Sequence, residues 1–392
     1  MKIGRRKMIK NCVAVLDVGS SKITVLVGQR GVNDTITERF VTKNEYSGFA
    51  EGKFFDIAEL ETAVASAIKS VCAALKTTVG EITVCVPGAF VRLENRKYKI
   101  VFGKKKKITE DDKEDLFDAG QDLVETEGYE VINRSEIYFA LDDNKKVFDP
   151  VGRVSAMLGG YINYTLCEKY FIDTFRTALK KAGVTTVNFV FDALAESLYL
   201  FDSRRRETPS LIIDSGYITT TASIVLGGGV VAKHSEDFGG GLIAYRIVKT
   251  FGIAPDVADS LQRIINLSLA RQSGQTYKIE TKNGYEEYLA EEINSAATEE
   301  IDLYLDNLEA FIAENIHKVN GGFGVYLTGG GLSYVRGIKE YISARLGLPV
   351  EIVKPKLPSY GKTEETSYYA ALDYALNEQE KKKKGFLGFF RK

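Results

Sequence analysis

The sequence predicts an α/β protein with two lobes, a small α+β module inserted in its first half and an amphipathic helix at its carboxyl end. Three observations support this prediction: two similar hairpin segments about half a chain apart, alternating helix and strand patterns, and a basic, aromatic terminus. The chain has 392 residues, of which 44% are hydrophobic. Because single cores stop growing near ~250–300 residues, we expect more than one core.

The two hairpin segments are VAVLDVGSSKITVLVG at residues 13–28 and LIIDSGYITTTASIVLGG at residues 211–228. Each indicates a β-branched strand, an Asp-x-Gly turn with hydroxyl side chains, and a second strand. Two ordinary Asp/Gly hairpins would give the same pattern. However, glycine allows a ligand to approach the backbone, and Ser, Thr and Lys donate hydrogen bonds to phosphate oxygens. Two such hairpins therefore suggest a bilobed clamp around a nucleotide.

The segment between the hairpins predicts a helix over residues 58–77, followed by the strand EITVCVPGAFVRL. Residues 81 to about 165 then indicate a compact module of strands with one or two helices, in which Thr109 resembles a helix N-cap. The helix YFIDTFRTALKKAGV and the strand NFVF follow. The module is therefore expected to be an insertion in the first lobe.

The second half combines a helical block with a glycine turn. Residues 295–318 have apolar positions at three- and four-residue spacing, which is typical of an amphipathic helix. The stretch VYLTGGGLSYVRGIKEYI then indicates a strand, a turn at residues 328–331 and a helix. Triple glycine allows backbone amides to approach a ligand, although a tight turn without a ligand predicts the same letters.

Composition excludes several classes of function. The formal net charge of −1 argues against a nucleic-acid binder, and two histidines argue against a His-dependent triad or a multi-His metal centre. Four scattered cysteines without a CxxC pair are expected to be reduced thiols, as in the cytosol. No apolar run approaches the ~18–20 residues that span a bilayer. Both ends of the chain are basic.

The order of features is the strongest signal in the sequence: first hairpin, inserted module, helix FDALAESLYLF, second hairpin and glycine turn. This order resembles the superfamily of actin, heat-shock chaperones and sugar kinases, and the inserted module with the basic terminus resembles the bacterial FtsA cell-division family. The resemblance implies an actin-like, two-lobed ATPase fold of duplicated ribonuclease H-like domains. The implied first lobe comprises residues 11–80 and 166–208, with the inserted subdomain at 81–165 between them. The implied second lobe comprises residues 209–258 and 323–352, with an outer subdomain at 259–322. A docking helix and linker at 353–380 and the tail at 381–392 follow.

The resemblance also implies residues that bind ATP, with magnesium held only through the nucleotide and no metal held by protein side chains. These residues are Asp17, Gly19, Ser20, Ser21, Lys22, Asp214, Gly216, Thr219, Gly240, Gly241, Asp259, Gln262, Thr328, Gly329, Gly330, Gly331 and Leu332. The catalytic candidate is Asp192, at the position of the carboxylate that orients a hydrolytic water; a helix N-cap is the alternative role.

The second phosphate loop departs from the family pattern Asp-x-Gly-Gly-Gly-Thr-x-Asp. Here Asp214 and Gly216 remain, but Tyr217 and Ile218 follow, and the final acid is absent. Such side chains are unfavourable where a phosphate cradle requires positive φ and close backbone approach. Arg246 also stands where an acidic residue is expected. The sequence therefore predicts that nucleotide binding is weak at most and that hydrolysis is very slow or absent.

The terminal segment KKKKGFLGFFRK places aromatic side chains on one face if it is helical, with cations on the other. A docked or disordered end is the alternative. The predicted membrane-binding residues are Lys383, Lys384, Phe386, Leu387, Phe389, Phe390 and Arg391. In membrane binding, each large apolar side chain contributes ~1.5–3 kcal/mol when buried, and each cation near anionic lipid contributes ~1 kcal/mol. Ordering the backbone costs ~1–2 kcal/mol per residue, so the net binding free energy is small. One tail should bind reversibly, and tails arrayed on a polymer should bind by avidity.

The resemblance implies the partners and the location. An FtsA-like protein would form filaments on the cytoplasmic side of the cell membrane at the midcell division septum, bind the FtsZ C-terminal peptide around residues 260–320 and recruit later division proteins. A PilM-like cytoplasmic scaffold for a pilus or other membrane assembly is the main alternative. A sugar or acetate kinase would not need the cationic amphipathic terminus, and a chaperone would need a further substrate-binding domain.

Overall fold

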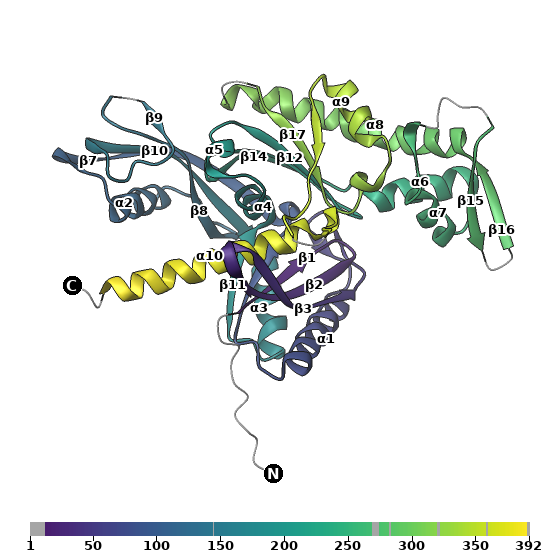
Figure 1. Ribbon diagram of the computed structural model, residues 1–392, viewed down its shortest axis with the longest axis horizontal. Helices are drawn as coiled ribbons and strands as arrows, with labels where there is room; N and C mark the ends of the chain where they lie inside the picture. The colour runs from purple at the N-terminus through teal and green to yellow at the C-terminus, as the bar shows by residue number, and fades with distance from the viewer. Residues whose placement is uncertain are drawn as a thin grey trace, which may run out of the picture.

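The computed structural model describes two lobes, an inserted subdomain and a long carboxyl-terminal helix (Figure 1). Its described residues are 12–143, 145–268, 274–281, 284–319, 322–357 and 360–389, with side chains described as far as Lys383.

The first lobe is built on a five-stranded sheet of order β11-β6-β1-β2-β3. The strands β1, β2 and β3 form an antiparallel meander, and β6 and β11 continue the sheet in parallel with β1. Its strands are β1 (Val13–Val18), β2 (Lys22–Arg30), β3 (Ile36–Glu45), β6 (Glu81–Val86) and β11 (Thr186–Phe191), with a small pair β4 (Phe49–Ala50) and β5 (Lys53–Phe54). Its helices are α1 (Ile57–Leu75), α3 (Lys169–Lys181), α4 (Asp192–Leu200) and α5 (Ser203–Arg206).

Both faces of the central strands β1, β2 and β6 are buried, which explains why these strands have nearly continuous hydrophobic sequences. Leu16 packs in a core cluster with residues of α1 and α3. Its neighbour Val15 points to the opposite face and packs in a cluster with α4 and the carboxyl-terminal helix. Helices therefore cover the sheet on both sides.

The inserted subdomain is an antiparallel sheet of order β7-β10-β8-β9 with one helix. Its elements are β7 (Val91–Lys107), α2 (Glu110–Gln121), β8 (Tyr129–Ala140), β9 (Lys146–Val147) and β10 (Val154–Glu168). The predicted N-cap at Thr109 is confirmed, because a reciprocal capping box joins Thr109 and Asp112. The predicted start at residue 81 is wrong, since β6 pairs with β1 in the first sheet and the subdomain begins after Val86.

The second lobe repeats the topology of the first. Its sheet has the order β14-β13-β12-β17-β18, with an antiparallel meander followed by two parallel strands. The strands are β12 (Ser210–Ser215), β13 (Thr220–Leu226), β14 (Gly229–Glu236), β17 (Gly324–Thr328) and β18 (Val350–Ile352), with helix α9 (Ile338–Leu346). This repetition confirms the duplication that the two hairpin segments predicted.

An outer arm projects from the second lobe (Figure 1). It consists of α6 (Gly240–Phe251), α7 (Pro255–Gln262), β15 (Thr276–Thr281), β16 (Gly284–Leu289) and α8 (Ala290–Asn315). The helical pattern predicted for α8 is confirmed, because Ile301, Tyr304, Leu305 and Leu308 are all buried in the core of this lobe. The 3-10 helices that lie wholly within the described residues are η1 (Val32–Asp34), η2 (Gly88–Phe90), η4 (Ile316–Lys318), η5 (Leu332–Tyr334) and η6 (Thr363–Glu365).

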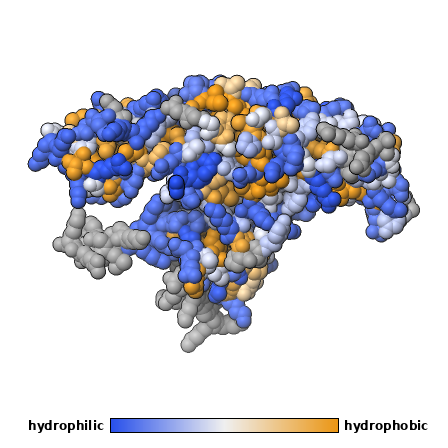
Figure 2. All heavy atoms as spheres, turned by 45° about the horizontal axis from the view of Figure 1, so that its top comes forward, coloured by the Kyte–Doolittle hydropathy of each residue, from blue (hydrophilic) through white to orange (hydrophobic). Residues whose placement is uncertain are grey.

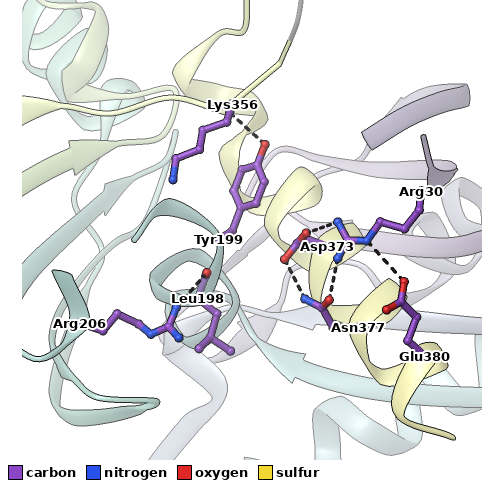
Figure 3. Close-up of polar contacts among 8 residues, drawn as sticks. All are labelled: Arg30, Leu198, Tyr199, Arg206, Lys356, Asp373, Asn377 and Glu380. Atoms are coloured by element: carbon purple, nitrogen blue, oxygen red, sulfur yellow. Dashed lines mark hydrogen bonds and ion pairs between the residues drawn. The ribbon is translucent and has the colours of Figure 1, made fainter. Parts of the chain in front are cut away.

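The carboxyl-terminal helix α10 (Thr366–Phe389) crosses the first lobe and continues beyond it (yellow in Figure 1). Leu372 packs so closely on β2 that a Cβ added to Gly28 would lie 2.6 Å from its Cδ2 atom. Arg30 reaches α10 from the end of β2 and binds three of its side chains (Figure 3). The Arg30 guanidinium lies 2.6 Å from Asp373, 2.6 Å from Asn377 and 3.9 Å from Glu380.

The predicted docking helix within residues 353–380 is α10, which begins at Thr366 and continues as one helix through Phe389, past the predicted boundary at residue 381. Lys382 at this junction contacts Glu81 of β6 at 3.3 Å, and Lys383 donates a hydrogen bond to Gln379. The backbone of Lys384, Phe386, Leu387 and Phe389 is helical as predicted. Their side chains, like Phe390 and Arg391, lie outside the described part of the structure.

The surface is mixed in character. Figure 2 shows hydrophobic residues gathered toward the middle of the visible face and mainly hydrophilic residues at its two ends. Among the described helices, none combines the length and the hydrophobicity needed to cross a membrane.

Candidate functional site

A cleft of about 460 Å³ lies where the two lobes meet. Four structural features supply its walls: the first hairpin turn, the second hairpin turn, the glycine turn after β17, and the segment that leads into α10. Of the predicted site residues, those that line the cleft are Asp17, Gly19, Ser20, Ser21, Lys22, Asp192, Asp214, Gly216, Thr219, Gln262, Gly329 and Gly330. The structure therefore brings together most of the residues that the sequence singled out.

Six predicted residues do not line the cleft but support the turns that do: Gly240, Gly241, Asp259, Thr328, Gly331 and Leu332. The amides of Gly240 and Gly241 donate hydrogen bonds to the carbonyls of Gly216 and Tyr217, at 3.2 and 2.7 Å. These two amides at the start of α6 therefore hold the second hairpin turn, where the family resemblance implied contact with a nucleotide.

The glycine turn and Asp259 also hold the second hairpin. The amides of Gly331 and Leu332 bind the carbonyl and the hydroxyl of Ser215, at 2.6 and 3.2 Å. Tyr217 donates a hydrogen bond from its hydroxyl to Asp259 at 2.9 Å. Tyr217, which replaces a glycine of the family pattern, is therefore accommodated along the wall of the cleft.

The two hairpin turns are directly connected across the cleft. The amide of Ile218 donates a hydrogen bond to the Oγ atom of Ser20 at 2.9 Å. Tyr46 fixes the first turn by donating from its hydroxyl to the carbonyl of Gly19, also at 2.9 Å. Ser20 thus joins the two lobes, a role that its position in a phosphate loop did not predict.

Carboxyl groups from both lobes lie in and next to the cleft: Asp17 and Asp214 are half-buried, and Asp192 and Glu196 are buried. Burial raises the pKa of Asp17 to about 6, although a hydrogen bond with Ser367 and the charges of Lys22 and Lys43 oppose this rise. Burial, followed by the charge of Asp17, raises the pKa of Asp214 to about 7. The pKa values of Asp192 and Glu196 are raised well above their ordinary range by burial and by repulsion from Asp214.

Asp192 is the first residue of α4, and Phe191 occupies the N-cap position. The alternative role of Asp192 as an N-cap is therefore wrong. One carboxylate oxygen of Asp192 instead accepts a hydrogen bond from the amide of Ala193 at 2.6 Å. Asp192 lines the cleft together with Asp214.

Glu196 is a residue that sequence reasoning missed. It is one turn along α4 from Asp192, fully buried, and neither of its carboxylate oxygens has a hydrogen-bond partner in the structure. An unpaired buried carboxylate is costly, so Glu196 favours its protonated form. A glutamate within the apolar pattern of FDALAESLYLF was the signal that could have identified it.

Gln262 presents the clearest unsatisfied donor in the cleft. Its side chain is 5% exposed, and its Nε2 atom has no hydrogen-bond partner in the structure. A buried amide that lacks a partner costs ~1–3 kcal/mol, so a ligand with an acceptor atom at this position would be favoured. The residues present therefore fit a nucleotide on this side of the cleft.

Four cleft residues follow the predicted second lobe and carried no signal in the sequence: Lys362, Thr363, Glu364 and Ser367. They enter the cleft because α10 returns to the first lobe after the second lobe is complete. Among the described residues, no group of three or more His, Cys, Asp or Glu side chains is placed to hold a metal ion. Arg246, which departs from the family pattern, forms an ion pair with Glu300 of α8.

Comparisons with known families match two parts of the chain. Residues 88–164 match the family model for the SHS2 domain inserted in FtsA, in agreement with the inserted subdomain. Residues 182–364 match the model for the type IV pilus assembly protein PilM.

Individual proteins are similar over most of the chain. The cell division protein FtsA of Borreliella burgdorferi is 22% identical over 361 residues, which cover 88% of this chain and 86% of that protein. The solved PilM-PilN type IV pilus biogenesis complex aligns with a TM-score of 0.62 at 16% identity, covering 95% of this chain and 99% of that chain. MreB 5 of Spiroplasma citri bound to AMPPNP aligns with a TM-score of 0.55 at 12% identity, covering 97% and 99%.

The duplicated sheets, the cleft between them and these structural similarities define an actin-fold protein. Within this fold, the inserted subdomain and most of the chain are similar to FtsA proteins.

Replacing Asp214 by Asn should stabilise the free protein by an amount that depends on pH. The folded pKa of about 7 lies above the ordinary value of 3.8, so ionisation of Asp214 destabilises the folded state increasingly from about pH 4 to pH 7. Asparagine cannot ionise. We expect the gain in the free energy of unfolding to reach a few kcal/mol, as an order of magnitude, at pH 8 and to be much smaller at pH 4.5.

Urea unfolding of the two proteins at both pH values measures this gain. Asp173→Asn, which removes an exposed carboxylate from α3, is the control and should show no such dependence. A uniform loss of stability in Asp214→Asn at both pH values would contradict the account of the cleft electrostatics.

Proposed function

We propose that this protein is a cell-division protein that polymerises on the cytoplasmic face of the cell membrane and tethers FtsZ to it. The match of residues 88–164 to the inserted FtsA domain and the FtsA relatives support a role in division. The observation that carries the membrane role is α10, which is docked on the first lobe and continues without a break into the segment KKKKGFLGFFRK.

The continuous helix has a mechanical consequence. A flexible linker would let the tail bind lipid in any orientation of the body, whereas a helix clamped by Arg30 restricts the orientations available. When the orientation is restricted, each subunit turns the same face toward the membrane. Neighbouring subunits held in this way can bind through many tails at once, which multiplies a weak individual affinity.

We infer that the cleft binds ATP, with magnesium held through the nucleotide, and that turnover is slow or absent. The first hairpin supplies Lys22, which has no ion-pair partner within 4 Å among the described residues, and Gln262 supplies an unpaired donor. Asp192 would orient the hydrolytic water. Burial favours its protonated, uncharged form, which is a poor acceptor for a proton from water.

The proposed docking region for the FtsZ C-terminal peptide is around residues 260–320. A groove of about 620 Å³ borders this region: Leu267 and Asp302 line one side of it, and α9 with Tyr341 lines the other. A groove of this kind, with polar and apolar walls, can accommodate a short peptide. Later division proteins would bind the assembled polymer.

A PilM-like scaffold for a pilus or other membrane assembly is the second candidate, because residues 182–364 match the PilM family model. Such a scaffold would bind a membrane protein rather than lipid. The cationic, aromatic terminus favours the division protein, and lipid binding discriminates between the two proposals.

Removal of residues 381–392 should abolish sedimentation of the protein with vesicles that contain anionic lipids. The double substitution Phe386→Ser with Phe389→Ser should reduce sedimentation at least tenfold, because burial of one large apolar side chain in the membrane contributes ~1.5–3 kcal/mol. Phe55→Ser, which changes a phenylalanine that is 60% exposed on the first lobe, is the matched control and should sediment normally. Equal sedimentation of the full and shortened chains would exclude the anchor.

Isothermal titration with magnesium ATP tests the cleft. Lys22→Ala should abolish binding, and Gln262→Ala should weaken it about fivefold, as expected for one hydrogen bond. Lys339→Ala, an exposed lysine on α9, is the control for a lost positive charge. Unchanged affinity in Lys22→Ala would mean that the first hairpin has only a structural role, and phosphate release well above background would contradict slow turnover.

A further inference from the structure

The segment that precedes α10 forms part of the cleft and is bonded to both lobes. The hydroxyl of Thr366 at the start of α10 forms a 2.8 Å hydrogen bond with the hydroxyl of Thr328 in the second lobe. Ser367 forms a hydrogen bond with Asp17 in the first hairpin. The first turn of the tail-bearing helix is therefore a junction between the two lobes.

Glu364 extends from this segment among the cations of the cleft. Its carboxylate lies 3.6 Å from the Nζ atom of Lys43 on β3, and it accepts a hydrogen bond from Tyr334. Burial alone would raise the pKa of Glu364, but the charges of Lys22, Lys43 and Lys362 keep it below its ordinary value. Glu364 is therefore held as a carboxylate.

The glycine turn is shaped to receive this side chain. A Cβ atom added to Gly330 would lie 3.1 Å from the Cβ atom of Glu364 and 3.7 Å from its Oε2 atom. Gly330 thus permits a close approach between the turn and Glu364. The same turn and the same lysine of the first hairpin are the groups that a nucleotide would contact.

We propose that Glu364 is an internal anionic ligand of the cleft, whose carboxylate takes the place of a nucleotide phosphate beside Lys22, Lys43 and the glycine turn. An entering triphosphate must displace it, because two anions cannot share these lysines without mutual repulsion. This inference rests on the proposed binding of nucleotide in the cleft. In this inference, Glu364 is the residue that weakens nucleotide binding.

The position of Glu364 connects the cleft to the tail. Glu364 is two residues before Thr366, where α10 begins, so displacement of its side chain acts at the first turn of the tail-bearing helix. If ligand binding moves α10 and thereby changes the affinity of the tail for lipid by some factor, attachment of the tail to lipid must change the affinity for the ligand by the same factor.

Titration of the full chain with magnesium ATP tests the inference in three variants. Glu364→Gln removes the charge and should tighten binding about tenfold. Glu364→Asp keeps the charge but withdraws it by one methylene group, and it should tighten binding by a smaller factor. Glu351→Gln removes an exposed carboxylate from β18 in the second lobe and should leave affinity unchanged. Thermal unfolding of each variant checks that it is folded.

The outcomes separate this inference from the proposal of nucleotide binding. If the native chain and Glu364→Gln bind ATP equally well, nucleotide binding survives and the internal-ligand role is overturned. If Glu364→Asp matches the native chain while Glu364→Gln binds more tightly, Glu364 acts only as a distant charge, which also overturns the role. If no folded variant binds ATP, both proposals fail. If only Glu364→Gln binds, the internal ligand blocks the native cleft.

Discussion

The packing of α10 on the first sheet is the interaction on which the rest of the structure depends. Leu372 and the small residues Ala370 and Ala371 fit against Val15 and Leu26, on the face of the sheet opposite α1 and α3. A sheet with apolar residues on both faces needs a cover on each, and α10 with α4 supplies the second cover. This packing places one end of α10 in the cleft and directs the other end away from the body.

The electrostatics of the cleft reflect a second constraint. Carboxyl groups from both lobes lie in and next to the cleft, where burial and repulsion favour their protonated forms. Glu364 lies near the lysines of the cleft. The proposed weakening of proton abstraction and of phosphate binding suits a scaffold whose state changes rarely better than an enzyme with rapid turnover.

Features with local signals were predictable from the sequence. The hairpins at Asp17 and Asp214, the capping box at Thr109 and the periodic pattern of α8 each depend on residues close together in the chain. Features that depend on the packing of α10 against the first lobe could not be predicted, and for this reason Glu364 and Ser367 were missed. A boundary between the docking helix and the tail was predicted at residue 381, but lysines favour helix, and α10 continues across this position. The substitutions in the second loop could be recognised in the sequence. The hydrogen bonds that attach this loop to Gly240 and Gly331 could not, because these residues are distant from it in the chain.

We propose that assembly multiplies a weak lipid contact made by the end of α10. Electron microscopy of the full chain on an anionic lipid monolayer tests polymer formation and membrane attachment together. The account predicts ordered filaments on the lipid, with the carboxyl end of α10 facing it in every subunit. Isolated particles bound at the same density as filaments, or filaments that form in solution and ignore the lipid, would contradict it.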